Sequence, residues 1–296
     1  MNSINEKMAY IDESLTTIKN NLYLQSGEPI TSAAAKTLPY VYAPRKLVFS
    51  GTIYNEELPL ISPKNITHIL FSGNFSEPHV DLSMWDVSHF TSLGNVFSNN
   101  RSFTSIDISG WATKKAGYTG YMFYGTSALT NIITDEKTKI KTNDVSLMFH
   151  SCGATKLNLK WLDTSACTHI TQPFDWCQNL EELEINEWDV SNCTKIYLAG
   201  GTAFSNMKKL DLSKWHTPKL TSLTIMNGGC NNMELLDIRN FDFSKHTSGL
   251  SGSFRDGFPM DCLIIVKDDT QKALLQKKKS DLTNIKTVAE YEAMQQ

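Results

Sequence analysis

Apolar and polar positions recur along this 296-residue chain with a period of about 26 residues. The phrase DLSMWDVSHFTSL at 81–93 returns 103 positions later as EINEWDVSNCTKI at 184–196. Block starts lie at Asp81, Asp107, Ile133, Asn158, Glu184, Asp211 and Asp237, so successive starts differ by 26, 26, 25, 26, 27 and 26. Repeats of about 20 to 29 residues are typical of solenoids, in which each coil buries its apolar face against its neighbours. The period therefore predicts stacked structural repeats and not a duplicated active site.

Each block opens with polar and apolar residues in alternation, as in TSIDIS at 104–109, and this indicates a short, half-buried strand. The aspartate and serine of the WDVS phrase favour a turn after the strand. Four phenylalanines keep the same interval and are expected to stack from coil to coil: Phe97, Phe123, Phe149 and Phe174. The predicted fold is an α+β solenoid, a leucine-rich-repeat-like rod of about seven 26-residue coils with short parallel strands.

The ends of the chain differ from the repeats. Residues 1–26 are predicted to form an amphipathic helix for assembly or attachment, because six apolar residues follow the a/d spacing of a heptad seam: Ile4, Met8, Ile11, Leu15, Ile18 and Leu22. The alternative is a helix packed on its own protein. We expect a linker at 27–44, an N-terminal cap at 45–80, the solenoid at 81–262 and a C-terminal cap at 263–296, formed by a strand over 263–266, a turn and a helix.

An aromatic column also follows the repeat interval, in positions that fit either a structural or a binding role. Its members are Trp85, Trp111, Trp161, Trp188, Trp215 and Phe241. As a structural ladder they would close the corner of each coil. Facing solvent, they would form a strip suited to stacking sugars or contacting proteins. The sequence leaves both orientations open.

Composition excludes several classes of function. The net charge of -3 and the pI near 6.2 give no broad basic surface, so we expect no nucleic acid partner. The longest apolar runs are too short to span a bilayer, and the N-terminus lacks a secretory signal pattern. The six cysteines form no C-x-x-C pair and have no histidine at zinc spacing. We expect buried, reduced thiols, no metal, no cofactor and no membrane insertion.

Catalysis is not expected either. Polysaccharide-cleaving phage proteins need a pair of carboxylates in a groove. The recurring aspartates Asp86, Asp163 and Asp189 instead occupy repeat positions, where a role in turns explains them. The seven histidines are scattered and match no catalytic motif. The sequence therefore predicts no catalytic residues.

The phrases LSMWDVSHFTSLGNVF, ISGWATKKAGYTGYMF and INEWDVSNCTKI resemble the repeats of bacterial surface leucine-rich-repeat proteins, the BspA-like and mycoplasma-type families. The resemblance covers about residues 64 to 266, although the third block has Asp135-Glu136-Lys137 where the tryptophan should fall. It implies an adhesion or recognition module without a shared catalytic apparatus, found on bacterial cells and in bacteriophage tails. The N-terminal INEKMAYIDESLTTIKNNL is similar to the first segments of tail and baseplate proteins from phages of Gram-positive hosts.

The resemblance implies a virion structural protein, in a tail, baseplate or fibre, that presents the solenoid for recognition of the host surface. Its expected partners are other virion proteins bound through the N-terminal helix, further copies of itself, and a host cell-wall glycan or surface protein. The expected location is the virion, assembled in the host cytoplasm. Two alternatives stay open: an adhesin on the bacterial cell surface, and a polysaccharide-cleaving tailspike.

Overall fold

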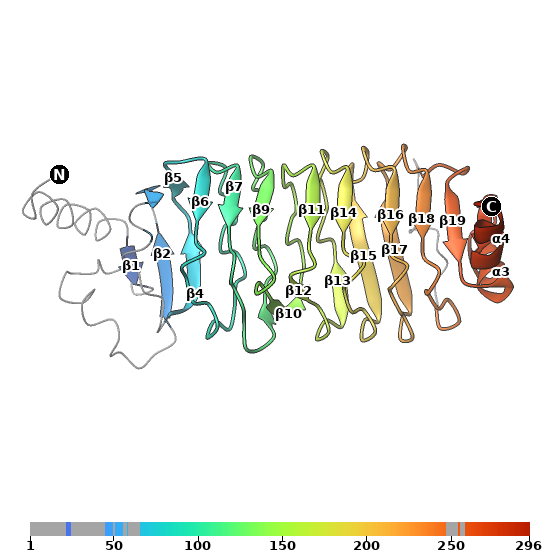
Figure 1. The fold of residues 1–296 in the computed structure, drawn as a ribbon, viewed down its shortest axis with the longest axis horizontal. Helices are drawn as coiled ribbons and strands as arrows, with labels where there is room; N and C mark the ends of the chain where they lie inside the picture. Colours follow the sequence, from blue (N-terminus) through green and yellow to red (C-terminus); the bar gives the residue numbers. More distant parts are fainter. Residues whose placement is uncertain are drawn as a thin grey trace, which may run out of the picture.

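The computed structural model describes residues 22–24, 45–49, 51–55, 58, 66–246, 254 and 258–296. The repeats wind into a parallel β-solenoid, in which short strands from successive coils stack along one axis (Figure 1). This confirms the predicted solenoid of parallel strands. The helices that the structure describes lie at the C-terminal end, and the described repeats are built from strands and turns. In the described part of the chain, no helix is long and apolar enough to cross a membrane.

One row of strands forms the upper half of the solenoid in Figure 1. Each of its seven repeat strands ends at one of the block starts that the sequence indicated. They are β6 (His79–Asp81), β7 (Ser105–Asp107), β9 (Asn131–Ile133), β11 (Lys156–Asn158), β14 (Glu182–Glu184), β16 (Lys209–Asp211) and β18 (Leu235–Asp237). Equivalent residues pair directly: Asp81 lies opposite Asp107, and Asp107 lies opposite Ile133. The 26-residue interval is therefore the length of one turn of the coil.

A second row lies on the other side of each coil. Its strands are β2 (Arg45–Phe49), β4 (Ile66–Phe71), β8 (Gly117–Tyr118), β10 (Ile140–Asp144), β12 (Leu162–Asp163), β13 (His169–Thr171), β15 (Lys195–Gly200) and β17 (Ser222–Asn227). They pair in parallel within three groups, β2 with β4, β8 with β10 and β12, and β13 with β15 and β17.

The parallel winding continues beyond both ends of the segment 81–262. Before it, β2 pairs with β4, and β3 (Thr52–Ile53) pairs with β5 (Asn74–Phe75). After it, β19 (Leu263–Val266) continues the first row beside β18, and β20 (Ile285–Thr287) pairs with β19. The strand expected over 263–266 is thus one more layer of the same sheet.

Two helices cover the C-terminal end. Helix α3 (Asp269–Lys278) begins at Asp268, whose carboxylate accepts a hydrogen bond from the Gln271 N–H. Helix α4 (Val288–Ala293) begins with a capping box, in which Thr287 and Glu290 bond each other's backbone N–H groups. The sequence indicated the first of these helices and missed the second.

The N-terminal end differs from the expectation. Leu22–Leu24 form strand β1, which pairs antiparallel with β2. A helix over 1–26 therefore does not extend through Leu22, because this residue belongs to a sheet. The other seam positions (Ile4, Met8, Ile11, Leu15, Ile18) and the 27–44 linker lie outside the described residues.

Stacked phenylalanine rings form the centre of the core. The ring centroids of Phe97 and Phe123, and of Phe123 and Phe149, lie 5.3 Å apart, and those of Phe149 and Phe174 lie 6.0 Å apart. The predicted stacking is confirmed. It continues at one end to Phe71, whose ring lies 5.4 Å from that of Phe97. From Phe71 to Phe174, one phenylalanine ring per coil thus fills the same place in the interior.

Candidate ligand-binding face

The predicted tryptophan column is buried, so it is a structural ladder and not a binding strip. Its six side chains are between 0% and 4% exposed: Trp85, Trp111, Trp161, Trp188, Trp215 and Phe241. The rings of Trp188 and Trp215 lie 6.3 Å apart and almost parallel. Each indole needs a hydrogen-bond acceptor inside the core. Trp111 donates to the Leu82 carbonyl at 2.8 Å, and Trp215 donates to the Ile185 carbonyl at 2.9 Å.

Trp161 departs from this pattern. Its indole N–H donates to the carbonyl of Asn158 in its own coil, whereas the indoles of Trp111 and Trp215 reach the preceding coil. The reason is visible in the sequence, because Trp161 follows its block start by three residues and Trp111 follows its block start by four.

The recurring aspartates build turns. The carboxylates of Asp86, Asp163 and Asp189 each accept a hydrogen bond from the backbone N–H two residues later, at 2.9, 3.2 and 2.9 Å. Hydrogen bonds from Ser88 lower the pKa of Asp86, as expected for a carboxylate that accepts local N–H groups. These hydrogen bonds agree with the role in turns that the sequence predicted for the three aspartates.

All six cysteine thiols are free and buried. Burial raises the pKa of Cys167 and of Cys193 to about 12. Such thiols are protonated at neutral pH and react slowly, since the thiolate is the nucleophile. Within the described residues, no group of histidine, cysteine, aspartate or glutamate side chains is arranged to hold a metal ion.

The surface over the first row of strands carries salt bridges between neighbouring coils. Lys156 bonds Glu182 at 2.5 Å, Lys160 bonds Glu184 at 2.7 Å, and both pairs are more than half exposed. Exposed pairs of this kind contribute little to stability, because water and salt screen the attraction between the charges. This side of the solenoid is a solvated, charged surface.

The opposite side has a different chemistry. There the second row runs into turns that also stack from coil to coil, and we call residues 92–99, 118–125, 144–151, 171–176 and 197–201 the turn face. Backbone bonds join these segments in sequence: Asn95 N–H donates to the Gly120 carbonyl, Tyr121 N–H to Ser146, and Leu147 N–H to Thr171. The side chains of the turn face are thus carried on a regular, hydrogen-bonded backbone.

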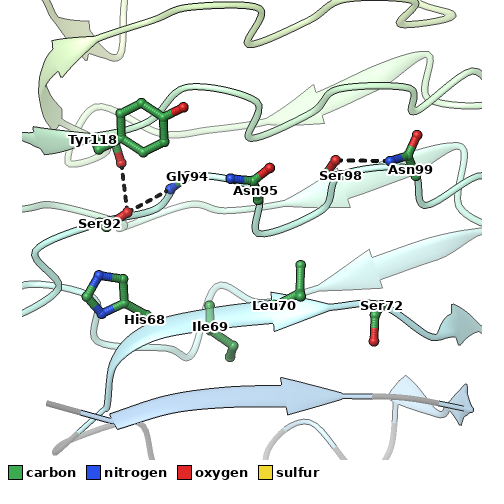
Figure 2. Close-up of a pocket in the computed structure, with 10 residues that line it drawn as sticks. All are labelled: His68, Ile69, Leu70, Ser72, Ser92, Gly94, Asn95, Ser98, Asn99 and Tyr118. Carbon is green, nitrogen blue, oxygen red and sulfur yellow. Dashed lines mark hydrogen bonds between the residues drawn. The ribbon is translucent and has the colours of Figure 1, made fainter. Parts of the chain in front are cut away.

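A groove of about 600 Å³ opens at the N-terminal part of the turn face (Figure 2). One wall is formed by β4 and the residue after it, and the other by the next coil. Its lining residues are His68, Ile69, Leu70, Ser72, Ser92, Gly94, Asn95, Ser98, Asn99 and Tyr118. The groove combines hydroxyl and amide groups, which can form hydrogen bonds with a ligand, with the apolar and aromatic surface that ligand sites usually contain.

Aromatic side chains continue from this groove along the turn face. Tyr118 lies at its edge, and its ring covers the backbone of Gly94 and Gly120. The rings of Tyr121 and Tyr124 lie 5.4 Å apart, and Tyr124 stacks on His150 at 4.6 Å. We call Tyr118, Tyr121, Tyr124, His150 and Trp176 the aromatic strip. All but Trp176 are partly buried, and Trp176 is 48% exposed.

A buried carboxylate lies beside Trp176. Asp175 is 5% exposed, and its oxygens accept hydrogen bonds from the Gly200 N–H and the Gln172 side-chain amide, both at 2.5 Å. Burial raises the pKa of Asp175, against the opposing effect of these hydrogen bonds and of nearby His150.

The aromatic strip was not predicted from the sequence. Trp176 falls outside the 26-residue column, fifteen residues after Trp161, and the three tyrosines occupy one coil only. These residues could have been found as aromatic residues that do not recur at the 26-residue interval. An aromatic residue outside that interval is not part of a column that packs from coil to coil, so it is a candidate for binding.

The comparisons with known proteins agree with the repeat pattern. A family model described as "Mycoplasma protein of unknown function, DUF285" matches residues 64–161 and 143–256. No curated protein matches the chain. The two matches together cover the repeat region that resembles the mycoplasma-type surface repeats. The chain therefore belongs to the family described as Mycoplasma protein of unknown function, DUF285.

Proposed function

We propose that the protein is a non-catalytic recognition protein of a bacteriophage virion, part of a tail, baseplate or fibre, and that its turn face binds the host surface. The observation that carries the proposal is the contrast between the two sides of the solenoid. One side is a regular charged surface, and the other holds a groove of about 600 Å³ followed by the aromatic strip.

The architecture suits repeated weak binding. The aromatic core and the backbone bonds between coils hold the turn face in one conformation, so a ligand does not have to order it. Many copies on one particle raise the effective concentration of the second and later contacts. Contacts that are weak on each rod then give stable attachment.

A bacterial surface adhesin is the second candidate. The match to a family described from Mycoplasma favours it, because that description concerns a bacterial protein and not a virion protein. Both candidates use the same face in the same way, and they differ in where the chain is displayed.

Immunogold electron microscopy with antibodies against the solenoid separates the two settings. We expect label at the tail or baseplate of particles purified from a producing culture. Label confined to the surface of the bacterial cell would contradict the virion proposal and support the adhesin.

Cell binding tests the recognition role in either setting. The full chain, labelled with a fluorophore, should bind bacterial cells and be displaced by excess unlabelled chain. A Trp176→Ala variant should bind less, whereas Met84→Ala should bind as the unchanged protein does. Met84 is a matched control because it is also exposed, at 47%, and lies outside the turn face. Absence of saturable binding would contradict recognition.

A further inference from the structure

Trp176 differs from the other five tryptophans of the chain. They are at most 4% exposed, whereas Trp176 is 48% exposed. Its backbone has a φ of 61°, in the left-handed region that bulky residues rarely adopt. Neighbouring coils place Asn99, Gly125 and Ser151 at the equivalent position, also with positive φ. A tryptophan is thus held in a strained backbone conformation, at a position where the neighbouring coils have asparagine, glycine or serine.

The next coil supports this exposed ring. A Cβ atom at Gly201 would lie 3.0 Å from the indole, so the ring of Trp176 lies closely against the Gly201 backbone. Glycine at this position leaves room for the ring, and the φ of 64° at Gly201 also suits glycine. The exposed indole is therefore a supported platform and not a loose side chain.

Polar groups converge next to the platform. A Cβ atom at Gly200 would lie 2.7 Å from the Tyr197 hydroxyl and 3.4 Å from both oxygens of Asp175, so these groups flank one point. The Tyr197 hydroxyl accepts a hydrogen bond from Asn227 at 3.0 Å and keeps its own proton for another acceptor. The Asp175 carboxylate, which has about four lone-pair sites, can accept more than the bonds from Gly200 and Gln172. A donor and a strong acceptor thus lie over the backbone of Gly200, the residue before the Gly201 that the indole covers.

We propose that Trp176, Asp175 and Tyr197 form a subsite for a neutral sugar ring, a hexose or an N-acetylhexosamine, within a longer glycan. The apolar face of the sugar stacks on the indole, while neighbouring hydroxyls donate to Asp175 and accept from Tyr197. This inference rests on the proposed function and names the ligand class of the same face.

The turn face also indicates how the glycan is oriented and that its sugar at this subsite is uncharged. Tyr124, His150 and Trp176 belong to three successive coils, so Tyr124 and Trp176 lie roughly 10 Å apart along the axis at about 4.8 Å per coil. A glycan that runs parallel to the axis meets the stacked rings of Tyr124 and His150 after Trp176. Acidic sugars are excluded from the subsite because their carboxylates would meet that of Asp175.

Fluorescence quenching of the full chain tests the subsite directly. Acrylamide should quench mainly Trp176, because the other tryptophans are buried. The probes are maltotetraose, cellotetraose and chitotetraose. We expect at least one of them to protect Trp176 from acrylamide, with saturation. Failure of all three at millimolar concentration to protect it would overturn the proposal.

Variants identify the polar contacts. Tyr197→Phe and Asp175→Asn keep the indole, so the quenching by acrylamide should remain. The affinity for the protecting sugar should fall about tenfold in each variant, which corresponds to a loss of roughly 1.4 kcal/mol. Thermal melting checks that each variant is folded. If Asp175→Asn is unfolded, the test rests on the affinity of Tyr197→Phe alone. Equal affinity in the folded variants and the unchanged protein would overturn the assignment.

Treated cells separate this inference from the proposed function. Periodate oxidation of the cell surface should abolish binding of the chain, and protease treatment should leave it. Binding that survives periodate and is lost after protease treatment would show that the ligand is a protein. This result would support recognition of the cell surface and contradict the sugar subsite. Protection of Trp176 by a tetrasaccharide without any binding to cells would keep the subsite and contradict the recognition role.

Discussion

At the scale of single residues, the stacked phenylalanines concentrate much of the stability of the solenoid. Phe123 is fully buried between Phe97 and Phe149, with both ring centroids 5.3 Å away. Its contacts join three coils, so its removal leaves a cavity at the centre of the stack and separates two neighbours.

We expect Phe123→Ala to lower the free energy of unfolding by about 3 to 5 kcal/mol. Urea denaturation followed by circular dichroism measures the change. Met84→Ala should change it by less than about 0.5 kcal/mol, because an exposed side chain loses few contacts. A loss below about 1 kcal/mol for Phe123→Ala would show that the ring stack is not a main source of stability.

Asp175 gives a residue-scale prediction with a defined dependence on pH. Burial raises its folded-state pKa above the ordinary value of 3.8, so the folded state binds the proton more tightly than the unfolded state. The stabilising contribution is fully present below pH 3.8 and is lost as pH rises through the raised pKa. Asp175→Asn removes this titration. The stability of the variant relative to the unchanged protein should therefore be greater at pH 7 than at pH 3.

Asp86→Asn provides the control of opposite sign. Hydrogen bonds from Ser88 lower the pKa of Asp86, so its contribution is present at neutral pH and is lost as pH falls through the lowered pKa. Urea denaturation at both pH values should show the relative stability of the two variants moving in opposite directions. A parallel shift in both would contradict the raised pKa of Asp175.

The repeat interval determines which residue contacts can be predicted from the sequence. The interval aligns Phe97 with Phe123 and Trp188 with Trp215, so stacking follows from spacing alone. It does not say which side of the coil a column faces, and the burial of the tryptophans required the structure. Trp176 has no counterpart at the same interval, and its position beside Asp175 and Gly201 depends on backbone angles that no spacing encodes.

At the scale of elements, the seven repeat strands of the first row are three residues long and end at a turn. Asp107 shows how this happens, because its backbone pairs within the sheet while its carboxylate accepts the Ser109 N–H at 2.8 Å. The D-x-S phrase thus sets the end of the strand, and the sequence located these ends well. It did not indicate β1, since a three-residue strand that pairs with β2 more than twenty residues later has no local signal.

The C-terminal elements protect the last layer of the sheet. Strand β20 pairs with β19, and the middle residues of β19 are buried. Without β20 the backbone groups and apolar side chains of β19 would form an open edge, which is a template for pairing with another chain.

Deletion of residues 285–296, which form β20 and α4, should therefore cause self-association. Size-exclusion chromatography with light scattering should show larger species that increase with protein concentration. Substitution of the exposed Met294 by Ala is the control, since it changes the terminal segment without opening the edge. A truncated chain with the same mass as the full chain would show that β19 needs no cover.

At the scale of the whole molecule, the solenoid presents one charged side and one side with a groove and aromatic rings. Avidity requires several such rods held together, and the predicted seam at Ile4, Met8, Ile11, Leu15 and Ile18 is the segment expected to do this. A test of this seam must keep strand β1. A chain without its first 30 residues would also lack β1 and would expose the edge of β2, so a change in its mass would have two explanations.

A chain that starts at residue 20 retains β1 and lacks the seam. We expect light scattering to give a multimer for the full chain and a monomer for this shortened chain, because the apolar seam is the proposed contact between copies. Ile11→Glu with Leu15→Glu in the full chain should have the same effect, since charges replace two seam positions without any truncation. A monomer mass for both the shortened chain and the double variant, beside a multimer for the full chain, would support assembly through the seam. If the full chain is itself a monomer, the seam does not join copies of this chain, and multivalent display would then require docking to a different protein.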